Sequence, residues 1–450
     1  MRKYILAFLV VVMTAVCLPT HGFSSEATIP TIRAGLFYDK GAREFYVIGS
    51  DDAFTLGLRL GKEIIPALDF GMQELEIVNI SSSGFQLLPQ SFNDVAEAFD
   101  FASNLSSRGT EAHLYFDGTW AVLAKGNTMS SASFPSVLIK GSGDDMGVVF
   151  PLTMDKPIVF ETPGLRGEGL LHLNGNRFRG KLELLPSDNG GITVVNELGL
   201  EEYLYGVLPK EMSVTWHMDA LKAQAVASRT YAVNSLSKWQ QYGFDVKADI
   251  GDQVYGGYDA ENVVTNQAVD ETRGQLLLYD SKPITSFYHT DSGGITEACS
   301  EAFGAEKPYL VPVKDDFSNN SPHSQWEVSI SLSTISKRPE IVEKNIGDIE
   351  GIVVTKKSPA GRVTEISLIG STGQMPLTYS QIRSVLSLKS NLFDEIPSQD
   401  KGADYVFVGS GFGHGVGMSQ WGAKSMAENG YNYVAILQHY YKNVEINNIF

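Results

Sequence analysis

The sequence predicts an α+β protein that is rich in strands, in which a smaller N-terminal α+β module precedes one large second domain. Short strand-like runs bounded by turn residues outnumber helical segments along the 450 residues. This length supports two or three domains with a sizeable core. A glycine-rich stretch at 164–169 divides the two parts. We therefore expect a leader over 1–25, an N-terminal region over 26–160 and the second domain over 161–450.

The N-terminus has the three parts of a secretory signal. Arg2 and Lys3 are basic, Ile5–Leu18 is apolar, and the following residues are mostly small and polar. A cut near Gly22 or Ala27 fits this pattern. The apolar run is short for a membrane span, and an uncleaved anchor is the alternative. We expect a secreted or envelope-associated, extracytoplasmic protein that meets the membrane only through this segment if it is uncleaved.

Composition excludes several classes of partner. The net charge of −17 argues against nucleic acid, whose backbone requires a basic surface, and against anionic lipid. Cys299 is the only cysteine beyond the leader, so no disulfide forms within the chain. Cys17 invites a lipoprotein interpretation, but Val16 stands where a small residue is expected. Stability must therefore come from the hydrophobic core.

The N-terminal region alternates strands with one helix. Expected strands are Thr31–Tyr38, Glu44–Ile48 and Leu75–Ile80, followed by a helix at Phe92–Leu105 and a hairpin of Glu111–Phe116 and Thr119–Ala124. The βαββ order around 75–130 is weakly similar to a SPOR domain, a small fold that binds peptide-free glycan. The alternative is a generic α+β module that packs Trp120 in its core.

The second domain continues with short strands and several helices. Expected strands are Gly180–Leu185, Ile192–Asn196, Gln275–Tyr279 and Pro283–His289, with a hairpin of Gly351–Lys356 and Arg362–Ile369. Expected helices are Leu200–Tyr205, Asp219–Gln240, a helix capped by Ser419 that ends at Asn429-Gly430, and Tyr433–Tyr441. A polar linker is expected at Ile396–Ala403.

One carboxylate, Glu211, stands between a proline and a tryptophan just before an alanine-rich helix. Pro209 suits a chain reversal or the first turn of a short helix. Asp219 is a good N-cap for the helix that follows. A carboxylic acid beside apolar and aromatic groups such as Trp216 loses solvation of its anion, so its pKa rises toward that of a useful proton donor.

Four sequence blocks together resemble the SpoIID/LytB family, the stage II sporulation protein D and its cell-wall relatives. They are Leu208–Trp216 running into Asp219–Tyr231, Gly251–Gly257, Phe287–Gly294, and Gly411–Ala423. Each block alone fits a turn or a glycine-rich loop, but their order makes the match specific. The resemblance extends from about 164 to 450 and identifies 161–450 as a SpoIID-type catalytic domain.

The resemblance implies a peptidoglycan lytic transglycosylase with Glu211 as general acid and base. It would cleave glycan strands, preferably peptide-stripped ones, between MurNAc and GlcNAc and leave a 1,6-anhydroMurNAc end. Glycoside cleavage usually needs two carboxylates, but an attack by the substrate's own C6 hydroxyl needs one. Glu201, Glu202 and Asp219 are expected to be solvated or caps; a catalytic role for one would make the enzyme a hydrolase. The alternative is that Glu211 is a helix-terminal carboxylate without chemistry.

Further residues in these blocks are candidate sugar contacts. Arg229 and Tyr231 would bind sugar hydroxyls or hold Glu211, or else Arg229 bonds buried carbonyls. Gln253 and Tyr255 would read hydroxyls and stack on a ring face, or else pack a turn.

Two more blocks add His289, Ser292, His414 and Gln420 as cleft residues, with core packing as the alternative for both histidines. No metal or cofactor is expected, because His289 and Cys299 do not make a four-ligand zinc site.

Two other functions are consistent with the same predicted cleft. One is a non-catalytic wall-binding protein that enhances an N-acetylmuramoyl-L-alanine amidase, a role also attributed to this family. The other is a purely structural envelope protein without glycan affinity. Only the transglycosylase needs an ionisable group at Glu211, so replacement by Gln separates it from both.

Overall fold

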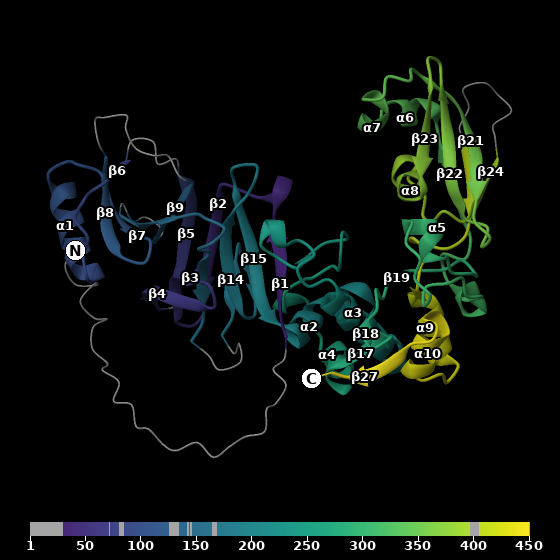
Figure 1. The fold of residues 1–450 in the computed structure, drawn as a ribbon, viewed down its shortest axis with the longest axis horizontal. Helices are drawn as coiled ribbons and strands as arrows, with labels where there is room; N and C mark the ends of the chain where they lie inside the picture. Colours follow the sequence, from purple (N-terminus) through teal and green to yellow (C-terminus); the bar gives the residue numbers. More distant parts are fainter. Residues whose placement is uncertain are drawn as a thin grey trace.

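The computed structural model describes residues 30–71, 73–80, 85–125, 135–141, 144, 146–163, 169–396 and 405–449. Its mixture of helices and many strands confirms the α+β class. Two large sheets, a helical layer and a smaller strand-containing unit follow one another along an elongated molecule (Figure 1). The leader, the glycine-rich stretch except Gly169, and the linker except Ile396 lie outside the described residues. Within the described part, no helix has the length and apolar character to cross a membrane.

A seven-stranded sheet joins the start of the chain to the second domain, in the order β16-β1-β15-β14-β11-β3-β4. Its strands are β1 (Thr31–Phe37), β3 (Phe54–Leu60), β4 (Glu63–Phe70), β11 (Ile158–Glu161), β14 (Lys181–Pro186), β15 (Ile192–Gly199) and β16 (Val246–Lys247). β1 is antiparallel to β15, with Thr31 opposite Gly199. The hydrogen bonds of this sheet therefore join strands from both sides of the expected domain boundary at 160/161. That boundary stays a prediction.

A nine-stranded sheet holds most of the N-terminal region, in the order β13-β12-β2-β5-β9-β10-β7-β8-β6. Its strands are β2 (Phe45–Ser50), β5 (Gln73–Ile80), β6 (Phe85–Leu87), β7 (Ala112–Phe116), β8 (Trp120–Lys125), β9 (Ser136–Gly141), β10 (Val148–Pro151), β12 (Leu171–Leu173) and β13 (Asn176–Phe178). Helix α1 (Val95–Ser107) contacts β7 and β8. Trp120 is buried with its ring centroid 4.7 Å from that of Phe116, so it packs in a core as the generic-module alternative expects. The likeness of 75–130 to a SPOR domain stays a prediction.

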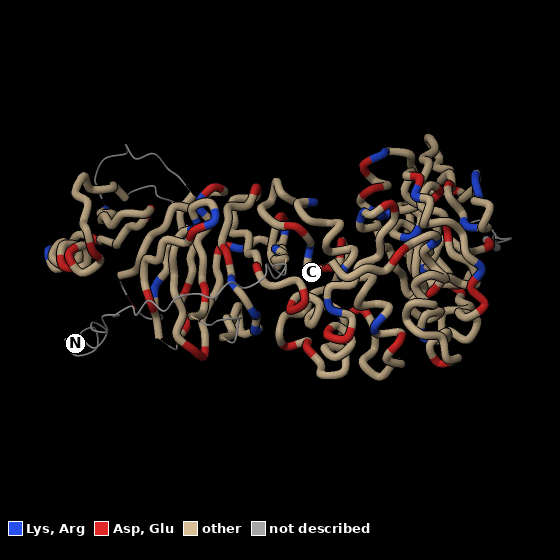
Figure 2. The backbone as a smooth tube through the Cα atoms, turned by 60° about the horizontal axis from the view of Figure 1, so that its bottom comes forward, with Lys and Arg blue, Asp and Glu red and all other residues tan. Residues whose placement is uncertain are grey.

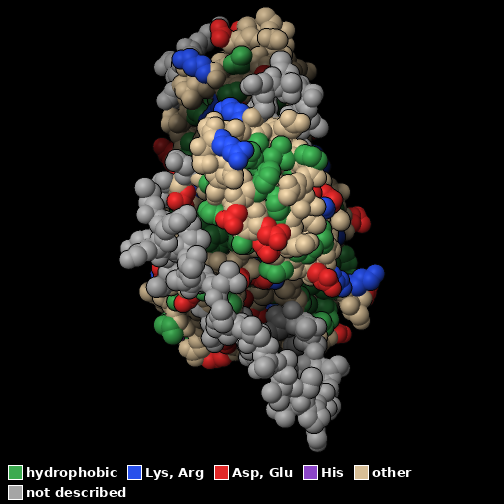
Figure 3. Space-filling model, turned by 90° about the vertical axis from the view of Figure 1, so that its left-hand side faces the viewer, with side chains coloured by type: hydrophobic (Ala, Val, Ile, Leu, Met, Phe, Trp, Pro, Cys, Tyr) green, Lys and Arg blue, Asp and Glu red, His purple; other side chains and the backbone are tan. Residues whose placement is uncertain are grey.

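The end of the molecule that carries this sheet shows hydrophobic side chains among scattered charged ones (Figure 3). Phe45 and Leu87 are among its exposed hydrophobic residues. Within the described residues, acidic and basic positions are interspersed along the backbone rather than gathered in separate regions (Figure 2).

The helical layer packs around α3. Its elements are α2 (Leu200–Glu211), α3 (Met218–Asn234), α4 (Val263–Glu271), β17 (Gln275–Tyr279), β18 (Lys282–Pro283), α9 (Gln420–Glu428), α10 (Tyr433–Tyr440) and β27 (Glu445–Asn448). The remaining short elements of the described residues outside the smaller strand-containing unit are η1 (Asp39–Gly41), η2 (Gln240–Tyr242), η3 (Tyr258–Ala260), β19 (Tyr288–His289), α5 (Cys299–Phe303), η4 (Asp316–Asn320) and β26 (Met418–Ser419). Ala220, Ala223 and Ala227 of α3 are fully buried, because small side chains let α2, α9 and α10 approach closely.

Three predictions for this layer were wrong in their boundaries. Helix α2 continues past residue 205 to Glu211 and includes Pro209, which lacks an amide hydrogen, because buried apolar residues on the preceding turns hold it. Helix α3 is capped by His217, which accepts from the Asp219 N–H at 3.2 Å, so Asp219 is not the cap. It ends at Asn234 rather than 240, since Ser237 takes a positive φ of 64°. The strand expected at 283–289 is split into β18 and β19.

The remaining unit has its own hydrophobic core, separate from the main one. Its elements are β20 (Trp326–Ile330), α6 (Leu332–Ser336), α7 (Pro339–Val342), β21 (Ile349–Lys357), β22 (Val363–Gly370), β23 (Gln374–Thr378), α8 (Tyr379–Leu386), β24 (Phe393–Ile396) and β25 (Tyr405–Gly409). The expected hairpin is present as β21 and β22. The unit is inserted between β19 and β26, which pair in parallel with Tyr288 opposite Met418.

Candidate active site

The carboxyl group of Glu211 ends helix α2 at the centre of a polar network. Its Oε1 accepts the backbone N–H of Val254 at 3.0 Å. The side chains of Tyr288 and Gln420 also hydrogen-bond to it. Burial raises the pKa of Glu211 above the ordinary value of 4.5, and these three hydrogen bonds oppose the rise. The pKa of Glu211 is therefore shifted in the direction expected of a proton donor.

A second row of hydrogen bonds fixes the groups that touch Glu211. Gln253 is buried and donates from Nε2 to the Tyr288 hydroxyl at 3.1 Å and to the Ser228 carbonyl at 3.3 Å. The Tyr203 hydroxyl donates to Oε1 of Gln253 at 3.4 Å. Helices α2 and α3 thus hold Tyr288 from one side.

Gln420 is held in the same way from helix α9. Its Nε2 donates to Oε1 of Gln224 at 3.4 Å, and Gln224 donates to the Ser228 hydroxyl at 2.9 Å. Ser419, the N-cap of α9, accepts from the Gly422 N–H at 3.2 Å and fixes the start of the helix. The site therefore joins residues more than 200 positions apart in sequence.

The other acids considered from sequence are all engaged elsewhere. Glu201 is buried, which corrects the expectation that it is solvated or a cap. Glu202 caps α2 by accepting from the Gly199 N–H at 3.2 Å. Asp219 accepts from the Tyr433 N–H at 3.0 Å. None of these three carboxylates is free to act with Glu211.

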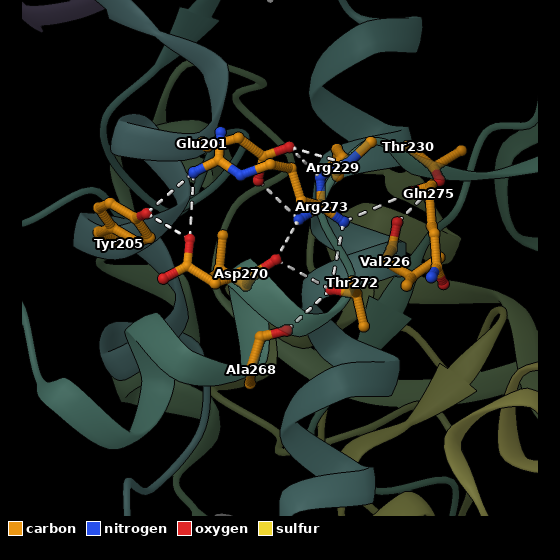
Figure 4. Close-up of polar contacts among 12 residues, drawn as sticks. Glu201, Tyr205, Val226, Arg229, Thr230, Ala268, Asp270, Thr272, Arg273 and Gln275 are labelled. Atoms are coloured by element: carbon orange, nitrogen blue, oxygen red, sulfur yellow. Dashed lines mark hydrogen bonds and ion pairs between the residues drawn. The ribbon is translucent and has the colours of Figure 1, made fainter. Parts of the chain in front are cut away.

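Arg229 lies in a buried ion pair rather than beside Glu211 (Figure 4). Its Nε and Nη2 donate to the two oxygens of Glu201 at 2.8 and 2.7 Å. Nη2 also donates to the Val269 carbonyl at 3.1 Å, and Nη1 to that of Gln275 at 3.4 Å. The alternative that Arg229 bonds buried groups is the one that the geometry fits.

Tyr231 and Tyr255 are likewise committed to internal contacts. The Tyr231 hydroxyl donates to Oδ1 of Asp252 at 2.6 Å. The Tyr255 hydroxyl donates to Oδ1 of Asn196 at 2.8 Å, and its ring lies 5.1 Å from that of Tyr203. Both tyrosines are buried, so neither presents a ring face to a ligand.

Asp252 anchors the loop that brings Val254 to Glu211. Besides Tyr231, its carboxylate accepts from Lys238 Nζ, from Trp239 Nε1 at 2.7 Å and from the Lys247 N–H at 2.8 Å. Burial alone would raise the pKa of Asp252, but these hydrogen bonds, that of Lys238 first, hold it below the ordinary value.

Asp252→Asn is expected to destabilise the protein by about 1–3 kcal/mol at neutral pH, because an amide leaves part of this donor set unpaired. A depressed pKa contributes stability above the unfolded value of 3.8, and this stability is lost as pH falls through the folded value. The difference from wild type, measured by urea unfolding, should therefore shrink in acid. Asp188→Asn, at an exposed turn, is the matched control; an equal loss in both variants would contradict the anchor.

His289 and His414 lie one layer behind Tyr288. Successive side chains of a strand point to opposite faces, so β19 directs Tyr288 toward Glu211 and His289 toward the glycine-rich loop. Nδ1 of His289 lies 3.1 Å from the Val416 carbonyl, and the two imidazole centroids are 5.5 Å apart. Burial lowers the pKa of His289 well below its usual range and that of His414 to about 3, so both are neutral.

Ser292 is fully buried and serves the turn after β19. Its hydroxyl donates to Oδ2 of Asp315 at 2.7 Å, and its N–H donates to the Ser419 hydroxyl at 3.2 Å. Asp315 also accepts from the Tyr440 hydroxyl at 3.0 Å. Ser292 thus ties the cap of α9 in place and does not face Glu211.

The structure thus brings together three of the predicted residues, Glu211, Gln253 and Gln420. Sequence reasoning missed Tyr288, although it lies inside the block Phe287–Gly294. A tyrosine on a strand is usually interpreted as a core residue. It also missed Asp252 within Gly251–Gly257. Among the described residues no cluster of His, Cys, Asp and Glu has the composition of a metal site.

An open pocket of about 630 Å³ lies elsewhere, lined in part by Arg177, Arg179 and Tyr258 but not by Glu211. Its two arginines already pair with Asp259 and Glu261, at 2.7 and 2.6 Å. We therefore assign the candidate site to the surroundings of Glu211.

Comparisons with known proteins cover both the helical layer and the inserted unit. The sequence model of the stage II sporulation protein family matches residues 188–279, which include Glu211 and Gln253. That of a domain of unknown function (DUF8618) matches residues 310–417. An uncharacterized protein of Brachyspira hyodysenteriae is 36% identical over 292 residues, which cover 64% of this chain and 76% of that protein.

Relatives that carry functional names are also similar to this chain. The stage II sporulation protein D of Bacillus amyloliquefaciens is 33% identical over 272 residues, covering 56% of this chain and 75% of that protein. The amidase enhancer of Bacillus subtilis is 29% identical over 286 residues, covering 53% of this chain and 39% of that protein.

Proposed function

This chain belongs to the stage II sporulation protein D (SpoIID) family, and from that premise we propose that it is an extracytoplasmic lytic transglycosylase of peptidoglycan. Family membership itself supports a cell-wall related role. The proposed reaction cleaves glycan strands, preferably peptide-free ones, between MurNAc and GlcNAc. It needs no cofactor.

The observation that carries the proposal is the state of the Glu211 carboxyl. Burial raises its pKa, while the Val254 N–H and the side chains of Tyr288 and Gln420 fix its orientation. A carboxyl that holds its proton closer to neutral pH is a better general acid for a glycosidic oxygen. Glu201, Glu202 and Asp219 are engaged elsewhere, which favours a reaction that needs one carboxyl over hydrolysis with two.

The reaction balances with Glu211 as the one proton carrier. Its carboxyl protonates the bridging oxygen as the bond from C1 of MurNAc to that oxygen breaks. The C6 hydroxyl of the same MurNAc forms the new bond to C1 and releases its proton to the Glu211 carboxylate. The enzyme is regenerated and no water is consumed.

Product masses test this reaction directly. Protein beginning after Ala27 is incubated with amidase-stripped glycan strands, and with intact peptidoglycan beside them. We expect fragments with an anhydro end, lighter than the hydrolysis products by one water, and faster cleavage of the stripped strands. Fragments with a reducing end would instead identify a hydrolase and contradict the single-carboxyl reaction.

The similarity to the amidase enhancer favours a second candidate, a glycan-binding protein that stimulates a cell-wall amidase without cleaving sugars. In that case no fragments form, yet an added N-acetylmuramoyl-L-alanine amidase releases peptides faster in the presence of this protein. A Glu211→Gln variant would then stimulate the amidase as well as wild type does.

A further inference from the structure

A pair of tryptophans lies immediately beside the groups that hold Glu211. Trp216 is in the loop between α2 and α3, five residues after Glu211, and Trp421 directly follows Gln420. Their ring centroids are 5.1 Å apart at an interplanar angle of 62°. Both are partly exposed. Aromatic surface therefore begins within one residue of the polar network.

The row of rings continues along the two segments that lead into and out of the inserted unit. The His323 ring centroid lies 6.4 Å from that of Trp421, and the Phe412 centroid lies 5.0 Å from that of His323. We call Trp216, Trp421, His323 and Phe412 the aromatic row. Phe412 and His323 fall within residues 310–417, the match to the domain of unknown function. The row thus runs from α9 to the segments that join the inserted unit to the rest of the chain.

The backbone holds Phe412 firmly although its side chain is 40% exposed. Its N–H donates to the Asp291 carbonyl at 2.8 Å, and its carbonyl accepts from the Asp291 N–H at 3.0 Å. Gly411 and Gly413 on either side have φ of 81° and 106°, values that other residues rarely adopt. A residue whose backbone is already fixed in this way loses little backbone entropy when a ligand covers its side chain.

The position of the aromatic row beside the groups that hold Glu211, rather than its exposure alone, indicates a binding function. Single exposed hydrophobic residues are common and need no explanation. This row, however, is continuous and starts where the proposed reaction occurs. A glycan bound at Glu211 extends beyond the bond that is cleaved, and the C–H faces of its pyranose rings pack well on aromatic rings. Lys424, with Nζ 5.1 Å from the Trp421 ring centroid, adds a cation beside the row, although it already pairs with Glu428 at 2.8 Å.

We propose that the aromatic row is a binding ledge for the glycan strand, on which sugar units away from the scissile bond lie across Trp421, His323 and Phe412. The segments that lead into and out of the inserted unit then contribute part of the substrate-binding surface. This inference rests on the proposed function for the identity of the ligand, but not on cleavage.

Binding in a Glu211→Gln background tests the ledge separately from catalysis. The ligands are a peptide-free tetrasaccharide and peptide-free strands several times longer, and affinity is measured by calorimetry. Phe412→Ala is expected to weaken binding of the long strands roughly tenfold and of the tetrasaccharide less, because the ring lies at the far end of the row. Phe412→Tyr should restore the affinity. Phe45→Ala, which removes a ring of similar exposure (46%) from β2, is the matched control and should bind like the parent.

The outcomes separate the two proposals. If Phe412→Ala binds long strands as tightly as the parent, or if Phe45→Ala loses as much, the ledge is wrong while cleavage by Glu211 is unaffected. If wild type never cleaves but Phe412→Ala still binds long strands more weakly, the ledge stands and the transglycosylase proposal fails. A parent protein that binds no glycan at all would overturn the ledge.

Discussion

Glu211→Gln is expected to reduce glycan cleavage by roughly a hundred- to ten-thousand-fold, the usual contribution of a general acid or base. Glutamine keeps the size of the side chain and still accepts the Val254 N–H, but it has no proton to transfer. Release of anhydro-ended fragments from peptide-free strands is the measurement. Binding of the same strands should change little. Loss of binding together with loss of cleavage would instead mean that Glu211 is needed to bind the glycan.

The pH dependence provides two checks on the same variant. With the folded pKa of Glu211 raised above 4.5, wild-type cleavage should fall as pH rises through that folded value, since the acid form is lost. The raised pKa also means that ionised Glu211 costs stability at pH above the folded value, and that this cost vanishes below 4.5. Glu211→Gln should therefore be at least as stable as wild type at neutral pH. An inactive variant that also unfolds more readily would contradict this assignment.

Arg229→Met is expected to destabilise the protein by about 3–5 kcal/mol, the typical cost of removing one partner from a buried ion pair. Arg229 is fully buried and Glu201 is 2% exposed, so the remaining carboxylate has no access to solvent. Urea unfolding followed by circular dichroism gives the change. The double variant with Glu201→Gln should recover much of the loss, because the amide oxygen still accepts the Gly274 N–H that Glu201 accepts at 3.1 Å.

A neighbouring ion pair in the same network provides the control (Figure 4). Arg273 pairs with Asp270 at 3.1 Å, but the side chains are 44% and 51% exposed. Arg273→Met should therefore cost less than about 1 kcal/mol. Should Arg229→Met leave stability unchanged and instead weaken glycan binding, Arg229 would belong to the sugar site after all.

The sequence predicted local elements well where the pattern of apolar residues decides them. The strands at the start of the chain, the hairpin across Asp117-Gly118 and the Ser419 cap were expected and are present. It failed where packing overrides a local signal: α2 runs through Pro209 because Leu204, Val207 and Leu208 bury its apolar face. It also could not reveal that β1 pairs with β15, since such pairing depends on residues some 160 positions away.

The candidate site residues chosen from the sequence also fall into two groups, those that meet around Glu211 and those that do not. The family resemblance pointed to Glu211, Gln253 and Gln420 because they lie in the four matching sequence blocks. These three residues meet in the structure. Arg229 also lies in one of these blocks. Its ion pair with Glu201 joins two helices, and no local sequence pattern predicts such a contact. A sequence block therefore indicates that a residue matters, but not whether it serves the ligand or the fold.

The separate hydrophobic core of the inserted unit has a consequence for cooperativity. Ile335, Val363 and Phe407 belong to a core separate from the main one, while Tyr379 of the same unit packs in the main core. The two cores can therefore unfold at different temperatures. A calorimetric scan should then resolve two transitions, and the losses expected for the Asp252 and Arg229 variants refer to the transition of the main core. Damage at Arg229 would lower only the transition of the main core. Glu211 is held by Val254, Tyr288 and Gln420, which all lie outside the inserted unit, so this unit can loosen while Glu211 keeps its environment.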